Sequence, residues 1–436
     1  MQGSRFKQLF LNRDIRNKLL AVFFIVLLFR ILAHVPIPVA DAGTLSSFLE
    51  DLLQTNRFFG LIDLFSGGTI ANFSIALLGL IPYINASIIM QLMTQVSPKI
   101  KNLKQNEGEE GRRKINQYTR YLTLPLAMGQ AVGTIFFIRQ LAIDAGGVDI
   151  IGSPSLYEWF IMVTSITAGS MLLMWLGELI SEKGVGNGIS ILIASSIIAQ
   201  LPGIFSQAAA LIETTPEQAG QVAVIAVAAL ITTYLIVKLN EAQRSVKVSY
   251  AKRRQRSGYG GVESELPVRL LTAGVIPIIF AVAFLSVPTF VAQIFANAEA
   301  QWLQDLATNL TVWFDPTSIV YAVTYFLLVV AFTFFYTGIV FNPSDIAENL
   351  QKQGGFIPGI RPGQQTEDYL RRIVNRVTLF GALSLGVIAV LPFIGERLTG
   401  NELLTFGGTG LLIVVSVGIQ TMRQLDAQLV NASYER

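Results

Sequence analysis

Lys and Arg are concentrated in every second hydrophilic loop of this 436-residue chain. The basic segments are residues 5–18, 99–120, 238–269, 352–376, the short Gly-rich turn that holds Lys183, and the tail from Arg423. In the intervening loops, the only strongly basic residues are Arg57, Arg139 and Arg397. The loops at 203–220 and 294–316 contain no Lys or Arg. Lys and Arg near the ends of spans are retained on the cytoplasmic side. The alternation therefore predicts a polytopic membrane protein with both termini in the cytoplasm.

The composition agrees with that class. Apolar residues make up 52% of the chain and charged residues 14%, whereas a soluble domain has roughly 25% charged residues. The chain has no Cys, and His34 is its single His, so the sequence predicts no disulfide, no metal site and no metal cofactor. A basic segment precedes the first apolar run, but no small-residue cleavage site follows it. We therefore expect that run to be retained as the first span.

Ten apolar segments are candidates for spanning helices, each of which needs about 20 mainly apolar residues. We place them near residues 19–36, 73–96, 121–141, 157–178, 187–204, 221–238, 269–293, 317–341, 373–394 and 403–422. An even number of spans returns the C-terminus to the side of the N-terminus, as the charges require. The expected fold is all-α, with two five-helix halves, residues 1–205 and 206–436. The halves would have inverted topology, as in many transport proteins.

The predicted spans contain almost no ionisable side chains. The exceptions, Arg30 and His34, are four residues apart and therefore on one helix face. We interpret Arg30 as a structural residue, with a role in the pore as the alternative, and its side chain is near enough to the outer interface to snorkel there. We interpret His34 as an interfacial residue. Ion-coupled transporters generally need carboxylates inside the membrane, which argues against a solute transporter. The chain also lacks the G-x-S-x-G, H-E-x-x-H and P-loop motifs, so we expect no enzyme, and any transport must be driven by another protein.

The second predicted span is preceded and interrupted by helix breakers. Gly67 and Gly68 would end or kink a helix, and Pro82 removes a backbone donor. These breaks predict a short helix near residues 62–72 on the outer side, followed by a full span. Irregular backbone at membrane depth is tolerated only inside protein or beside water. The segment is therefore either a re-entrant packing element or a movable stopper in an aqueous cavity.

Five stretches, in order along the chain, resemble the SecY family, whose members form the central channel of the bacterial Sec protein translocase. They are FSGG at 65–68 with PYINASI at 82–88, GEEGRRKINQYTR at 108–120, MWLGE at 174–178 with GVGNGIS at 184–190, AGVIP at 273–277, and FNP at 341–343 with GGFIPGIRPG at 354–363. The resemblance runs from about residue 15 to the C-terminus. Ser245 stands where a second Arg often follows Arg244 in the family.

The resemblance implies a clamshell of two five-helix halves around an hourglass pore. Its waist would be a ring of aliphatic side chains, here called the collar: Leu80, Ile84, Ile189, Ile193, Ile276, Ile279 and Ile413. A flexible apolar collar can close around an extended chain and dewets when it is empty, which blocks ions. Leu80 and Ile84 lie one helical turn apart on one face, as do Ile189 and Ile193. Packed or lipid-facing aliphatic residues are the alternative interpretation.

The resemblance also implies a plug and a lateral gate. The plug would be a short helix near residues 62–72 that includes Asp63, Leu64, Phe65, Ser66, Gly67 and Gly68. The gate would open towards lipid between the second and third spans and the seventh and eighth, with polar contacts from Asn85, Ser87, Gln91, Asn187 and Thr272. Such hydrogen bonds in membranes contribute about 0.6 kcal/mol on average, which an apolar signal helix can overcome. Ordinary small-residue helix packing remains the alternative.

Two long basic loops, about 238–269 and 343–372, would dock partners on the cytoplasmic side. The residues concerned are Arg244, Lys252, Arg253, Arg254 and Arg361. Topology control and attraction to anionic membrane lipid are the alternative roles of these bases. The resemblance implies the motor ATPase SecA and the ribosome, with its rRNA and exit-site proteins, as docking partners. It also implies SecE and SecG subunits, signal peptides and nascent chains as further partners, and location in the bacterial cytoplasmic membrane.

Three hypotheses follow for the function. The first is a passive channel that translocates unfolded secretory proteins and releases transmembrane segments laterally into lipid. The second is a solute transporter with inverted repeats, which the uncharged spans disfavour. The third is a docking scaffold for ribosomes without conduction, which the broken second span and the collar disfavour.

Overall fold

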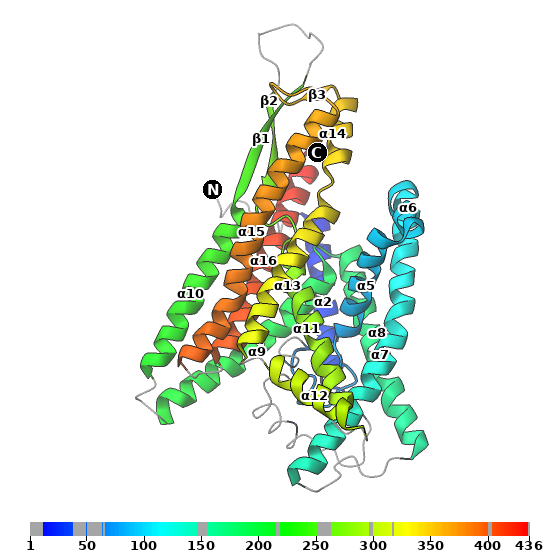
Figure 1. Ribbon diagram of the computed structural model, residues 1–436, viewed down its shortest axis with the longest axis vertical. Coiled ribbons are helices and arrows are strands. Elements are labelled where there is room, and N and C mark those ends of the chain that lie inside the picture. The colour runs from blue at the N-terminus through cyan, green and yellow to red at the C-terminus, as the bar shows by residue number, and fades with distance from the viewer. Residues whose placement is uncertain are drawn as a thin grey trace.

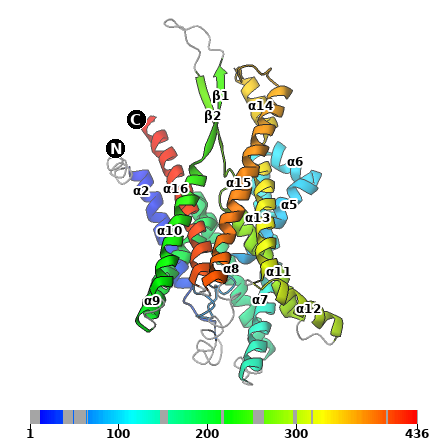
Figure 2. The ribbon, with the colours of Figure 1, turned by 60° about the vertical axis from the view of Figure 1, so that its left-hand side comes forward.

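The computed structural model describes residues 12–37, 49, 63, 66–146, 155–214, 219–250, 263–295, 300–315, 318–399 and 403–434. Its long helices run roughly along one axis and form a bundle (Figure 1). A β-hairpin projects from one end of the bundle. The start of α2 (Arg13–Leu32) and the end of α16 (Leu403–Tyr434) lie towards that end, as do helices α6 (Pro98–Asn106) and α14 (Pro343–Lys352) (Figures 1 and 2). Helix α12 lies at the opposite end. The basic segments that the sequence alternation singled out thus include several that gather at one end.

The first half of the chain contains six described helices of more than one turn. They are α2 (Arg13–Leu32), α5 (Ile81–Val96), α6 (Pro98–Asn106), α7 (Gly108–Gly146), α8 (Leu156–Lys183) and α9 (Gly188–Thr214). The predicted boundary between the halves, at 205/206, falls inside α9. The helix continues there because residues 205–214 contain no Gly or Pro that would end it. The connection to the second half therefore begins only after Thr214.

The second half adds both helices and strands. Its helices are α10 (Ala219–Glu241), α11 (Ile276–Phe295), α12 (Gln301–Trp313), α13 (Ile319–Val340), α14 (Pro343–Lys352), α15 (Gln364–Thr399) and α16 (Leu403–Tyr434). Its strands are β1 (Gln243–Tyr250), β2 (Glu263–Arg269) and β3 (Gly355–Phe356).

Each predicted span overlaps a described helix: in order, α2, α5, α7, α8, α9, α10, α11, α13, α15 and α16. Within the described residues, six helical segments are both long and apolar enough to cross a membrane. They are Gly108–Gln140, Leu156–Lys183, Gly188–Ala210, Ala219–Glu241, Ile319–Lys352 and Gln364–Gly395. The helix α5 has only 16 residues, and α2 begins with charged residues. The count of ten spans therefore stays a prediction.

The second span differs from the prediction, because its helix begins at Ile81 rather than near residue 73. Residues from Gly67 to Leu80 form turns, in which Phe73 has φ 41° and Gly79 φ 56°. These left-handed residues interrupt a right-handed helix. Pro82 occupies the first turn of α5, where its missing N–H costs nothing. The turn segment instead exchanges backbone hydrogen bonds with the residues after α2, including an isolated bridge between Pro36 and Ser74.

The fold is mostly helical, as expected, and the two basic loops add a small three-stranded sheet to it. Strands β1 and β2 pair antiparallel from Gln243↔Arg269 to Ser249↔Glu263, and β3 adds to the other edge of β1. Along β1, Val246 and Val248 are buried and Lys247 is exposed, the alternation of a half-buried strand. The two Val side chains pack with residues of α14 and α15. The two loops predicted to dock partners thus form one unit.

The main apolar core joins the two halves of the chain. It contains buried residues of α2, α5, α8 and α9 together with residues of α11, α13, α15 and α16. Five predicted collar residues belong to its buried set: Leu80, Ile84, Ile193, Ile279 and Ile413. The remaining two, Ile189 and Ile276, are partly buried and pack against it. The candidate site therefore lies at the junction of the halves.

Candidate functional site

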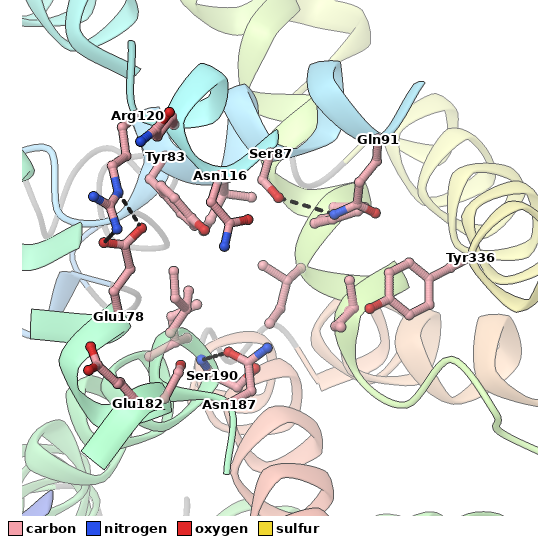
Figure 3. A pocket seen from close by; sticks show the side chains of 18 of the residues that line it. Tyr83, Ser87, Gln91, Asn116, Arg120, Glu178, Glu182, Asn187, Ser190 and Tyr336 are labelled. Atoms are coloured by element: carbon pink, nitrogen blue, oxygen red, sulfur yellow. Dashed lines mark hydrogen bonds and ion pairs between the residues drawn. The ribbon is translucent and has the colours of Figure 1, made fainter. Parts of the chain in front are cut away.

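A cavity of about 720 Å³ opens between the two halves, with walls from α5, α7, α8, α9, α11 and α13 (Figure 3). Five of the predicted collar residues line it: Ile84, Ile189, Ile193, Ile276 and Ile279. They come from α5 and α9 in the first half and from α11 in the second. The other two, Leu80 and Ile413, are 7% and 0% exposed in the adjoining core. Aliphatic side chains from both halves thus meet at one cavity.

The remaining side chains that line this cavity are mostly polar and form a second wall. Tyr83, Ser87 and Gln91 follow one another at four-residue steps along α5 and therefore share a face. They are joined by polar residues of α7, α8 and α9, among them Asn116, Arg120, Glu178, Glu182, Asn187 and Ser190 (Figure 3). Water can therefore enter a cavity whose remaining lining is aliphatic. The cavity thus combines a polar wall with aliphatic side chains of the predicted collar.

Arg120 and Glu178 form a two-bond ion pair at the cavity (Figure 3). The Arg120 Nε–Glu178 Oε1 distance is 2.9 Å, and the Nη2–Oε2 distance is 2.8 Å. The Arg120 side chain is 48% exposed, so the pair contributes about 1 kcal/mol or less. The paired geometry still fixes the orientation of the two side chains, and it holds α7 against α8. This pair was not predicted from the sequence.

The turn between α8 and α9 brings Asn187 and Ile189 to the cavity. The helices approach so closely that a Cβ on Gly188 would lie 1.9 Å from the carbonyl oxygen of Gly177. Ser181 Oγ donates to that carbonyl at 3.0 Å and accepts from the Gly188 N–H at 2.9 Å. Only glycine fits at this crossing. The turn therefore requires the Gly-rich sequence that the chain has there.

The predicted gate residues fall into three places. Ser87, Gln91 and Asn187 line the central cavity. Gln91 Nε2 donates to Ser87 Oγ at 3.1 Å, and Asn187 Oδ1 accepts from the Ser190 N–H at 3.2 Å (Figure 3). Asn85 instead lines a second, mainly apolar cavity of about 490 Å³ between α5, α7 and α11. Thr272 lines neither cavity, and its hydroxyl donates to the Arg269 carbonyl at 2.9 Å.

The predicted plug is described at Asp63 and from Ser66 onward, while Leu64 and Phe65 lie outside the described residues. Asp63 and Ser66 are helical, and the chain from Gly67 to Asn72 is in turns rather than in the expected helix. The Asp63 carbonyl accepts from the N–H groups of Gly67 and Gly68 at 2.8 and 3.1 Å. Gly67 and Gly68 both have φ 84°, a left-handed conformation that ends the helical turn.

Arg30, which the sequence led us to interpret as a structural residue, has its partner inside the protein. Its Nη1 donates to the carbonyl oxygen of Gly67 at 2.7 Å, so the side chain binds the plug segment instead of reaching an interface. A guanidinium at membrane depth is stabilised by an acceptor inside the protein, and here a left-handed turn supplies one. His34 is exposed, and its Nδ1 lies 2.8 Å from the Arg30 carbonyl oxygen.

Two of the predicted docking residues, Arg244 and Arg361, are among the described residues and lie in the unit formed by the two basic loops. Arg244 is exposed on β1, whereas Lys252, Arg253 and Arg254 lie outside the described residues. Arg361 is exposed between Gly359 at φ 82° and Gly363 at φ 98°. The Thr366 hydroxyl donates to the Arg361 carbonyl at 2.9 Å and fixes the backbone of this tip. The Arg361 side chain is therefore presented from an ordered turn.

A family model and the similar curated proteins agree with one another on the family. A family model described as SecY matches residues 74–422. The protein translocase subunit SecY of Streptomyces galbus is 41% identical over 441 residues, which cover 99% of this chain and 98% of that protein. The subunit of the same name from Corynebacterium glutamicum is 38% identical over 444 residues, with 98% of each chain covered.

Solved structures show the same fold at lower identity. A structure described as a protein-conducting channel aligns with a TM-score of 0.62 at 17% identity, covering 94% of this chain and 92% of that one. Sec61 in the canine ribosome–channel complex from the endoplasmic reticulum aligns at 0.60 and 18%, with the same coverage. A SecY structure whose plug domain is described as stabilising the closed state and maintaining a membrane seal also aligns at 0.60 and 18%.

Proposed function

The chain belongs to the SecY family and is therefore a multi-pass membrane protein and a protein-conducting channel subunit, not an enzyme, and we propose that the cavity of Figure 3 is the entrance to its pore. One observation carries the proposal. Aliphatic side chains of both halves line a single cavity whose other wall is polar. A translocating chain would enter along the polar wall and pass through the collar, which closes around it and excludes ions.

Lateral release is the second part of the proposal. Helices α5 and α7 meet α11 along one seam, and Asn85, Gln130 and Ser286 are polar residues in the apolar cavity there. Separation of α11 from α5 and α7 would open the pore sideways to lipid. Few polar contacts oppose that movement, so an apolar segment of the substrate can replace them. Transmembrane segments would leave the channel by this route.

The hairpin end is proposed to face the cytoplasm and to dock partners. Lys and Arg mark this end in the sequence, and the sheet joins both basic loops into one unit. The partners proposed are the motor ATPase SecA, the ribosome and anionic membrane lipid, with SecE and SecG as further subunits. We place the chain in the bacterial cytoplasmic membrane, with ten spans in two inverted halves and both termini inside. The transport of unfolded secretory proteins is driven by the docked partner.

The collar is tested by making it polar. Replacement of Ile279 by Asn should hydrate the waist, because an amide in the collar stabilises water where an apolar ring excludes it. Precursors with defective signal sequences should then be translocated about tenfold faster, which corresponds to about 1.4 kcal/mol of gating free energy. Ile413→Asn should act in the same direction. Translocation into inverted membrane vesicles measures the effect.

The matched control is Ile231→Asn, which makes the same chemical change on α10, where the Ile231 side chain is 54% exposed and lies outside the cavity. This variant should reject defective signals as the parent does. If Ile279→Asn and Ile413→Asn also reject them at the parental level, these residues do not form the gate.

A further inference from the structure

We propose that Arg30 and Gln200 form a polar latch that holds the plug segment, residues 63 and 66–73, beneath the collar and so sets how readily a substrate opens the channel. The inference rests on the proposed function of this segment as a plug. Arg30 lies on α2 and Gln200 on α9, so the latch joins the segment to two separate helices.

The contact from α2 is a charged hydrogen bond to the plug backbone. Arg30 Nη1 lies 2.7 Å from the Gly67 carbonyl oxygen. A Cβ on Gly67 would lie 2.9 Å from that nitrogen and 3.0 Å from Ser196 Cβ on α9. Gly67 is therefore enclosed between the guanidinium and α9. A side chain in this position would push the segment away from both helices.

The contact from α9 is made to Asp63, four residues earlier in the plug segment. Gln200 Nε2 donates to the Asp63 carbonyl oxygen at 2.7 Å and to its carboxylate Oδ2 at 3.2 Å. The other carboxylate oxygen, Oδ1, accepts from the Ile70 N–H at 2.9 Å. Asp63 thus fixes the shape of the segment and connects it to α9.

The position of the latch relative to the collar follows from the spacing along α9. Ile193 lines the central cavity, while Ser196 and Gln200 follow it by about one and two helical turns on the same face. At about 1.5 Å per residue, Gln200 lies roughly 10 Å further along the helix than Ile193. The plug segment therefore sits directly next to the collar, on the side away from the hairpin end.

Polar contacts of this kind suit a latch because they are lost together when the segment moves. A guanidinium at membrane depth is unfavourable without a hydrogen-bond partner. When the plug segment moves away, Arg30 must therefore bind water or the substrate instead. A substrate that brings water into the pore relieves that penalty. The alternative is that Arg30 merely stabilises the fold of the first half, and the experiment must separate the two.

The test uses the absence of cysteine from the chain. Ser196 is 1% exposed and lies against Gly67, so a Ser196→Cys thiol is covered while the plug is seated. The channel complex carrying this one cysteine is reconstituted in vesicles and treated with a water-soluble maleimide. Addition of Arg30→Met should raise the labelling rate about tenfold or more, since a lost hydrogen bond from a charged donor shifts opening by about that factor. Gln200→Leu should act in the same direction.

Two controls separate a latch from a general loss of structure. Ser416→Cys places a thiol at a site on α16 that is 3% exposed, and its labelling should stay slow in every variant. Arg30→Lys keeps a donor and should restore part of the protection. Unchanged Ser196→Cys labelling in either Arg30→Met or Gln200→Leu contradicts the latch, and so does a parallel rise at Ser416→Cys. If Arg30→Met is not inserted, Gln200→Leu alone decides the result.

The failure of the latch is distinguishable from the failure of the plug. Deletion of the plug segment tests whether the segment seals the pore at all, by the resting ion current. A leaky deletion together with protected Ser196→Cys in both latch variants leaves the plug standing and removes the latch. A tight deletion contradicts the plug itself.

Discussion

Replacement of Arg361 by Glu should reduce motor-driven translocation severely, while the chain is still inserted at near-normal levels. Arg361 is exposed at the tip of an ordered turn, and its backbone is held by Thr366. Two glycines with positive φ restrict that turn, so little ordering is needed for the guanidinium to bind a partner. Loss of a charge-assisted hydrogen bond and added repulsion should lower the rate by about tenfold to a hundredfold. Uptake of a precursor into inverted vesicles with SecA and ATP measures this rate.

Two further variants serve as controls for Arg361→Glu. Arg361→Lys should be partly active, because Lys keeps the charge but lacks the planar fork of donors. Arg376→Glu makes the same charge reversal at an exposed position of α15 outside the tip and should translocate at nearly the parental rate. Parental translocation by a stably inserted Arg361→Glu protein would leave Arg361 as an ordinary solvated side chain.

Deletion of residues 62–70 should raise the resting ion conductance of the channel about tenfold or more, because several hydrogen bonds of the closed state, each of about 1 kcal/mol, are lost together. The deletion removes Asp63 and Gly67, which bind Gln200 and Arg30. It leaves the bridge between Pro36 and Ser74 in the chain, so insertion should persist. Recordings in planar bilayers measure the current. A deletion variant as tight as the parent contradicts the plug.

The general architecture was predictable because it follows from local patterns. Basic loops and apolar runs each lie within one stretch of sequence, and each expected span overlaps a described helix, although the helix of the second span begins only at Ile81. The collar was partly predictable for the same reason, since Ile189 and Ile193 are one turn apart on α9. That Ile276 and Ile279 meet them across the cavity was implied only by the family resemblance.

The sheet could not be predicted because its pairing is non-local. The alternation of Val246 and Val248 around Lys247 is visible in the sequence, but it is short and lies in a basic loop. Strand β3 joins β1 from more than 100 residues away, through Ser249↔Phe356 and Tyr250↔Gly355. Nothing in either stretch alone indicates that partner.

The polar wall of the cavity was predicted only in part, because Ser87, Gln91 and Asn187 were assigned to a lateral gate while the other polar residues of the wall were not singled out. Tyr83, Ser87 and Gln91 recur at four-residue spacing, which indicates a polar face on α5. The pairing of Arg120 with Glu178 is again non-local and needs the packing of α7 on α8. The partner of Arg30 could not be predicted, because the position of a residue on a helix does not distinguish a contact at the interface from a contact inside the protein. The Gly67 carbonyl is exposed to Arg30 only by the left-handed turn.

The central claim is that this chain forms a protein-conducting channel through which another protein drives the substrate. Reconstitution of the chain with SecE in liposomes tests this claim most directly. An unfolded secretory precursor is added outside together with SecA and ATP, and protease then digests whatever has not crossed. The account predicts full-length precursor that is protected from protease until detergent is added, with no protection when ATP or the chain is omitted. Equal protection with and without the chain, or none in any sample despite correct insertion, would contradict the account.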